Sequence, residues 1–173
     1  MLLALLSSHR QQTLHKLDMK KMELKANKVI FFVDDLLKTS KPGNTGLQLE
    51  FRSYPPDRRL CVHTYLSEYL KRTSTHRGSE TVLFLSFKKP FGKISISTIA
   101  RWLRTVMICA GVDVKVFKPH SVRSAAASQA KAANVPVSEI LSRAGWKSER
   151  TFQTFYNKPI ARTSKGFETA VLQ

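Results

Sequence analysis

Apolar residues recur every three or four positions in several stretches of this chain, and this spacing predicts helices. The first is a leucine-rich stripe that runs to about Lys16 and contains Arg10. The clearest spans Ser95 to Ala110, with apolar side chains on one side and Gly111 to end it. Further helices are predicted from about Arg58 to Lys71 with Asp57 as N-cap, from Pro119, after Val135-Pro136, and after Ser148, with Tyr156 at its end.

Between the first two helices the pattern changes to runs of strand character. These runs are Met19 to Leu24, Lys28 to Leu37 and Leu47 to Phe51. Glycine, proline and asparagine concentrate at Pro42 to Gly46, which indicates a hairpin loop between the second and third runs. A further short buried strand is predicted from Thr81 to Ser86.

Length and charge narrow the class of protein. A chain of 173 residues with 42% hydrophobic residues fits one sizeable globular domain. Lysine and arginine number 29 against 12 acidic residues, a net charge of +17, which favours a polyanionic partner, most commonly nucleic acid. Solubility and an anionic membrane surface are the alternatives, but no long basic amphipathic helix is present. The apolar start, Met1 to Leu6, is too short to span a membrane.

The cysteines and histidines suggest neither a disulfide framework nor a metal site. Cys61 and Cys109 lie far apart in apolar helical patterns and are interpreted as buried, reduced thiols of an intracellular protein. The scattered histidines have no cysteine or carboxylate partner at ligand spacing; they are His9, His15, His63 and His76. We therefore expect no metal and no cofactor.

A group of polar residues in the second half has a spacing suited to phosphate chemistry. His120 and Arg123 are three apart, so both can lie on one helix face and reach the same phosphate. The small residues that follow, Ser124 to Ser128, allow that helix to pack closely. Trp146 follows Gly145, and the aromatic cluster that contains Tyr156 comes ten residues later. Each of these residues alone is more often structural, so their order is what favours a functional site.

The order His-x-x-Arg, Gly-Trp and Phe-x-x-Phe-Tyr resembles the C-terminal half of the catalytic domain of tyrosine recombinases, the phage integrase family. The resemblance covers about Leu2 to Tyr156 and implies an α+β fold that is mainly α-helical, with a small antiparallel three-stranded sheet. It also implies that residues 1–173 form a single catalytic domain, apparently truncated at its N-terminus, where relatives carry a DNA-clamping domain. Residues 157–173 correspond to a C-terminal tail that in relatives packs onto a neighbouring protomer.

The family pattern implies roles for residues in the first part of the chain. Arg10 corresponds to the first catalytic arginine, and Arg-x-Gln-Thr-Leu-His resembles recombinases of some eukaryotic mobile elements. Thr13 stands where relatives commonly have a carboxylate that anchors this arginine. Lys41, in Thr-Ser-Lys, corresponds to the lysine that acts as general acid, with Lys38 as the rival. Candidate DNA contacts, for which ordinary surface charge is the alternative, are Lys93, Arg101 and Arg104.

The resemblance implies DNA strand cleavage and rejoining on double-stranded DNA by a homo-oligomer. Tyr156 would attack phosphorus and leave a 3′-phosphotyrosine and a free 5′-hydroxyl, with His120 taking or holding the phenolic proton. Arg10, Arg123 and the Trp146 indole N–H would stabilise charge on the phosphate.

A second 5′-hydroxyl then reverses the attack, so recombination or integration of a mobile element needs neither metal nor ATP. One alternative is an inactive DNA-binding module of the same fold, and a more remote one is a type IB topoisomerase. The expected location is intracellular, in the nucleus if the source is eukaryotic and in the cytoplasm if it is bacterial or phage.

Overall fold

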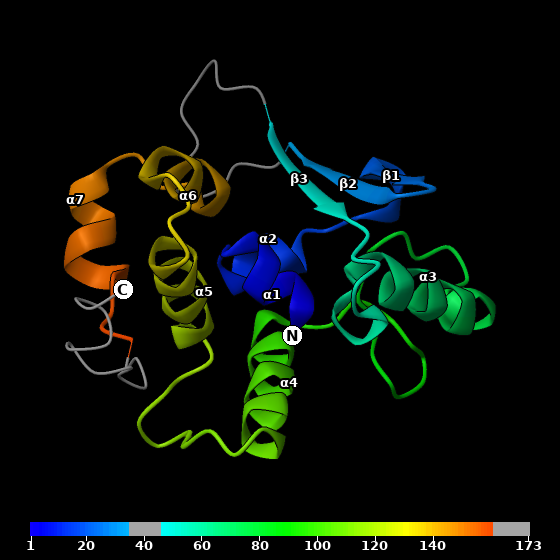
Figure 1. Cartoon of the computed structure of the whole chain (residues 1–173). Helices are drawn as coiled ribbons and strands as arrows, with labels where there is room; N and C mark the ends of the chain where they lie inside the picture. The colour runs from blue at the N-terminus through cyan, green and yellow to red at the C-terminus, as the bar shows by residue number, and fades with distance from the viewer. Residues whose placement is uncertain (35–45, 161–173) are drawn as a thin grey trace, which may run out of the picture.

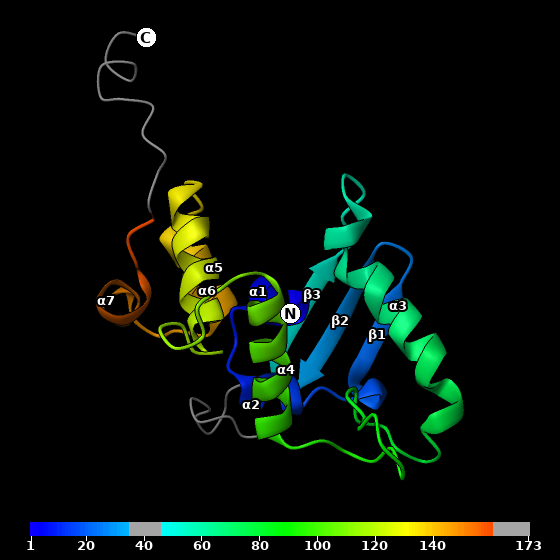
Figure 2. The same ribbon diagram turned by 90° about the horizontal axis from the view of Figure 1, so that it is seen from below.

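The computed structural model describes residues 1–34 and 46–160. Its helices are α1 (Leu2–Ser7), α2 (Gln11–His15), α3 (Val62–Thr73), α4 (Ile96–Cys109), α5 (Ser121–Ala132), α6 (Val137–Ala144) and α7 (Glu149–Thr151). Its strands are β1 (Met22–Lys25), β2 (Lys28–Val33) and β3 (Leu47–Arg52). The sheet and α3 form one flank, α5 to α7 form the other, and α1, α2 and α4 lie between them (Figure 1). The view from below shows the same arrangement (Figure 2).

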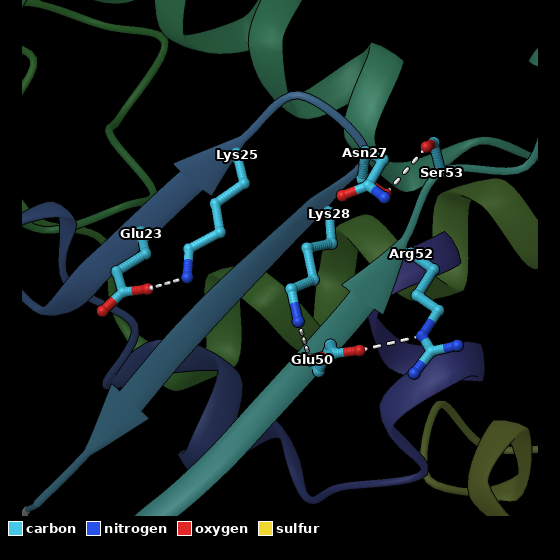
Figure 3. A network of polar contacts seen from close by, with 7 residues as sticks. All are labelled: Glu23, Lys25, Asn27, Lys28, Glu50, Arg52 and Ser53. Atoms are coloured by element: carbon cyan, nitrogen blue, oxygen red, sulfur yellow. Dashed lines mark hydrogen bonds and ion pairs between the residues drawn. The ribbon is translucent and has the colours of Figure 1, made fainter.

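The three strands form an antiparallel sheet in the order β1-β2-β3, as the resemblance implied. Phe31 of β2 faces the core, whereas the next residue, Phe32, is exposed, so the strand alternates at its end as a half-buried strand should. On the polar side, Glu50 of β3 accepts hydrogen bonds from Lys28 Nζ at 2.8 Å and Arg52 Nε at 2.9 Å (Figure 3). Because Lys28 and Arg52 are paired across β2 and β3, this carboxylate supports their register.

Two hydrophobic cores flank the start of α5. The larger core combines the inner face of the sheet with α3 and α4, and the smaller one joins Ala127, Ile140 and Ala144 to Trp146 and Phe152. Helix α5 takes part in both, since Val122 belongs to the first core and Ala127 to the second. Arg123, one residue after Val122, is only 5% exposed. The fold therefore places a charged side chain between two apolar clusters.

The N-terminal apolar stripe is not one helix, contrary to the sequence prediction. The chain breaks at Ser8, which adopts a left-handed conformation with φ of 53°, and Arg10 is the N-cap of α2 rather than an interior helical residue. The break turns the Ser8 carbonyl toward Arg123, whose Nε donates to it at 2.5 Å. A long-range contact therefore overrides the local helical pattern here.

The predicted strand from Thr81 to Ser86 is also wrong. In its place are the isolated bridges Asp18↔Val82 and Leu85↔Lys93. The Arg77 guanidinium satisfies the carbonyls of this segment, because its Nη1 donates to Val82 O at 2.7 Å and its Nη2 to Leu83 O at 2.9 Å. Leu83 and Leu85 of this segment are buried, but the Arg77 side chain supplies hydrogen bonds that a neighbouring strand would otherwise provide.

Smaller differences concern element starts and one cysteine. Asp57 caps a short 3₁₀ turn, Arg58–Leu60, and α3 begins only at Val62. Helix α5 begins at Ser121, two residues after Pro119. Cys61 is buried as predicted, but Cys109 is exposed at the end of α4, so the prediction that both thiols are buried is wrong for Cys109. Within residues 1–34 and 46–160, no helix is long and apolar enough to cross a membrane.

Candidate functional site

A cavity of about 350 Å³ opens where the central helices meet α5 and the end of the described chain. Arg10 and His120 line it, together with Arg123 and Tyr156. Four residues that the sequence analysis selected, from opposite ends of the chain, therefore border one space. The apolar part of its wall includes Leu14, Leu103 and Ile96, so α2 and α4 close the side away from α5.

Arg123 is held in the site by three hydrogen bonds of its guanidinium. Its Nε donates to Ser8 O at 2.5 Å and its Nη2 to Ala144 O at 2.6 Å, while its Nη1 donates to Tyr156 Oη at 3.2 Å. Burial lowers the pKa of Arg123 to about 10, which leaves the guanidinium charged at neutral pH. Two carbonyls thus fix the plane of the guanidinium, and its third bonded nitrogen points at the tyrosine hydroxyl.

Tyr156 ends a π-helical turn, Phe152–Tyr156, that continues from α7. Ser148 begins α7 as predicted, because its hydroxyl accepts a hydrogen bond from the N–H of Thr151. At the other end, Ser128 Oγ donates to Tyr156 O and accepts from the N–H of Lys158, both at 2.8 Å. This buried serine of α5 therefore holds the backbone on both sides of Asn157. It thereby fixes the backbone position from which the Tyr156 side chain extends.

The Trp146 ring lies against the other members of the site. It is 8% exposed, its centroid is 4.3 Å from that of Tyr156, and the Arg123 Cζ lies 4.4 Å from it. Gly145, with φ of 65°, ends α6, and the turn that it makes places Trp146 in the site. The indole Nε1 is buried and has no hydrogen-bond partner among the described residues. The prediction that Trp146 binds phosphate requires an N–H donor that is not already bonded, and this indole N–H meets that requirement.

Arg10 and His120 occupy the exposed rim. Arg10 is the N-cap of α2 and His120 is the N-cap of α5, so each lies at the start of a helix. Both are exposed to solvent. Thr13, in the place of the family's carboxylate, is only 4% exposed. Among the described residues, none accepts a hydrogen bond from the Arg10 guanidinium.

The structure adds His9, which the sequence analysis had treated as one of several scattered histidines. Its ring lines the same cavity, and its Nε2 is buried without a partner among the described residues. Burial first, and then the positive charges of Arg123, Arg143 and Arg10, lower the pKa of His9 to about 4. The imidazole is therefore neutral at physiological pH. The sequence signal was its position beside Arg10.

The structure describes the residues predicted to contact DNA, but it does not describe the two candidates for the catalytic lysine. Lys93 and Arg101 are exposed, and Arg104 is exposed with its Nη1 donating to Val114 O at 3.1 Å. Lys93 also lines a small polar cavity of about 120 Å³ beside the sheet, away from Arg123. Lys38 and Lys41 lie outside the described residues. Within the described ranges, no group of three or more His, Cys, Asp or Glu side chains could hold a metal ion.

Comparison with known proteins supplies a family. Residues 1–161 match the sequence profile of the phage integrase family. Among proteins with curated descriptions, none matches the sequence.

Solved structures share the fold. The crystal structure of XerA recombinase superposes with a TM-score of 0.67 at 20% identity, covering 90% of this chain and 51% of XerA. XerH recombinase bound to a palindromic difH substrate, in a post-cleavage complex, gives 0.66 at 13% identity, over 87% of this chain and 38% of XerH. The Tn1549 transposon integrase in complex with circular intermediate DNA gives 0.60 at 13%, over 99% of this chain and 54% of the integrase. The chain thus spans about half the length of XerA.

Proposed function

Because the chain belongs to the phage integrase family, we propose that it acts on double-stranded DNA in site-specific recombination or integration, with Tyr156 as the nucleophile. The observation that carries this proposal is the hydrogen bond between Arg123 Nη1 and Tyr156 Oη, 3.2 Å long, at the wall of a cavity that Arg10 and His120 also line. A scissile phosphate in that cavity would meet the two arginines and the tyrosine together.

The residues suggest how each would act. Tyr156 Oη attacks phosphorus, its proton passes to His120, and the 5′-oxygen leaves, so that a 3′-phosphotyrosine forms. Arg10 and Arg123 bear the negative charge that builds up on the non-bridging oxygens. The 5′-oxygen needs a proton, for which Lys41 remains the prediction and Lys38 the rival. A 5′-hydroxyl then attacks the phosphotyrosine, which restores the phenol and joins the strands.

The Trp146 indole N–H is the remaining donor. It is covered in this structure, and the Tyr156 ring lies 4.3 Å away from the indole ring. We propose that the tyrosine moves when it attacks phosphorus and that this movement exposes the N–H to a phosphate oxygen. The unpaired donor would then gain a charged acceptor, which makes the hydrogen bond stronger in the transition state than in the free protein.

Several recombinase structures support DNA and further protomers as partners. XerH was solved with difH DNA in pre-cleavage and post-cleavage complexes, and lambda integrase was solved as a dimer bound to a core site. We propose by extension that this chain binds double-stranded DNA as a homo-oligomer. The net charge of +17 provides the attraction for the phosphate backbone.

The proposal is tested with nicked suicide duplexes of random sequence. The wild-type chain is incubated with labelled DNA beside Tyr156→Phe, and the products are separated on a denaturing gel. A slow-migrating, protease-sensitive DNA band is expected for the wild type only. The same band from Tyr156→Phe would refute the assignment of the nucleophile.

The alternatives give other results. Salt-sensitive DNA binding without any adduct would favour an inactive DNA-binding module of the same fold. Relaxation of a supercoiled plasmid by the wild type, without strand exchange between duplexes, would favour topoisomerase chemistry.

A further inference from the structure

His9 lies at the junction between the two groups of residues that form the site. On its C-terminal side is Arg10, the N-cap of α2, and on its N-terminal side is Ser8, whose carbonyl accepts the hydrogen bond from Arg123 Nε. The His9 main-chain N–H donates to Ser7 Oγ at 3.2 Å, which holds this short connection between α1 and α2. The His9 side chain therefore extends from a backbone segment whose Ser8 carbonyl also binds Arg123.

The imidazole reaches across to the turn that carries the tryptophan. A Cβ atom at position 145 would lie 3.0 Å from His9 Cε1, and 3.7 and 3.8 Å from its Nε2 and Nδ1. The ring therefore covers Gly145 so closely that a methyl group would displace it. Its Nε2 is buried without a hydrogen-bond partner among the described residues, and the guanidinium charges of Arg123 and Arg143 act on the ring.

We propose that His9 is a positioning residue whose imidazole ring holds the Gly145-Trp146 turn at its working distance from the segment carrying Arg10. This role rests on the proposed function. The ring edge lies against Gly145 and so defines how near the end of α6 can approach the start of α2.

The charge of the ring matters as much as its shape. Arg10, Arg123 and Arg143 face His9 from α2, α5 and α6, and Tyr156 and His120 line the same cavity. A fourth positive charge at this place would repel the arginine that orients Tyr156. The neutral ring is maintained by burial and by those same arginines, which keep the pKa of His9 low. Glutamine can supply a similar planar donor that takes up no proton.

The first measurement is the single-turnover rate of adduct formation and the affinity for the same DNA. We expect His9→Ala to slow adduct formation by about ten- to a hundredfold, as for other groups that orient a reacting residue, with less than about a threefold change in the dissociation constant for DNA. His9→Gln should recover most of the rate. His63→Ala is the matched control, because His63 Nε2 contacts Lys25 O and neither residue lines this cavity. A wild-type rate in His9→Ala would overturn the proposal.

The second measurement does not depend on activity. The chain has two tryptophans, so a Trp102→Phe background reports the emission of Trp146 alone. His9→Ala should raise acrylamide quenching of Trp146 and shift its emission to the red, whereas His9→Gln should do neither. Unchanged emission in His9→Ala would overturn the positioning role even if the wild type formed no adduct. A wild type without adduct but with the expected emission change would refute the proposed function and leave the placement of Trp146 by His9 supported.

Discussion

Arg123 and Tyr156 are joined by a hydrogen bond of 3.2 Å between guanidinium Nη1 and phenolic Oη, and the guanidinium carbon also lies 4.9 Å from the tyrosine ring centroid. The arginine is held by two main-chain carbonyls from distant parts of the chain, whereas the tyrosine is half-buried and borders the cavity. The arginine is thus the fixed partner and the tyrosine is the one that is free to move.

Arg123→Lys should therefore slow adduct formation markedly, although the substitution keeps the positive charge. Lysine offers a single ammonium in place of a planar fork, so it cannot satisfy Ser8 O and Ala144 O and also reach Tyr156 Oη. We expect adduct formation to slow by about a hundred- to a thousandfold. Single-turnover kinetics on a suicide duplex would measure this, with Arg150→Lys, on the exposed side of α7, as the control. A loss below about threefold would show that charge alone suffices at this position.

Ser128→Ala should loosen the position of Tyr156 without removing any group that we propose to contact the phosphate. The hydroxyl donates to Tyr156 O and accepts from the N–H of Lys158, so its loss removes the hydrogen-bond partner of a partly buried carbonyl. We expect a loss of about 1 to 3 kcal/mol in the free energy of unfolding and a reduced rate of adduct formation at unchanged DNA affinity. Urea denaturation and the gel assay would measure the two effects. Ser124→Ala, on the same helix, should change neither by as much.

The stability of the protein should fall as the pH drops below neutrality, and His9 should account for part of the fall. Its pKa in the folded chain is about 4, below the ordinary 6.5, so the unfolded chain binds a proton first. The stabilisation is present above pH 6.5 and is lost progressively down to about pH 4, by about 3 kcal/mol over the whole window.

Thermal unfolding of the wild type and of His9→Gln between pH 6.5 and 5 would measure this contribution. The pKa of Glu50 is lowered to about 2, chiefly by its hydrogen bonds with Lys28 and Arg52, so that carboxylate stays ionised in this range. His9→Gln should flatten the dependence of the melting temperature on pH. A curve parallel to the wild type would show that other groups take up the proton.

Exposed Arg101 of α4 should contribute to DNA affinity through the phosphate backbone. We expect Arg101→Ala to weaken binding about equally for all sequences and to reduce the slope of log affinity against log salt concentration by about one. Arg72→Ala, in which Arg72 is paired with Glu68 on α3, serves as the control. An unchanged slope for Arg101→Ala would place α4 outside the DNA interface.

The parts of this molecule that the sequence predicted best are those whose signals are local. Helix α4 follows from a regular apolar stripe and a capping serine, and α6 ends at Gly145 because that residue takes a left-handed conformation. The choice of Arg123 and Tyr156 followed from the resemblance to a family pattern, and the fold brings both to one cavity.

What the sequence did not reveal depends on distant contacts. The break at Ser8 interrupts an otherwise regular stripe because the Ser8 carbonyl serves an arginine of α5. Ser128 lies within a run of small residues that predicted close helix packing. Nothing in the sequence indicated which group its hydroxyl would bind. The importance of His9 follows from its close contact with Gly145, which is far along the chain. Spacing along one helix cannot predict such pairs.

The bond between Ser8 O and Arg123 Nε has a consequence for the order of events during translation. The two residues are 115 positions apart. At the usual pace of a ribosome, about 5 to 20 residues per second, the carbonyl is made on the order of ten seconds before the arginine that it will hold. Tyr156 is made later still. The Arg123 side chain therefore cannot bind both the Ser8 carbonyl and the Tyr156 hydroxyl until nearly all of the described chain has been synthesised.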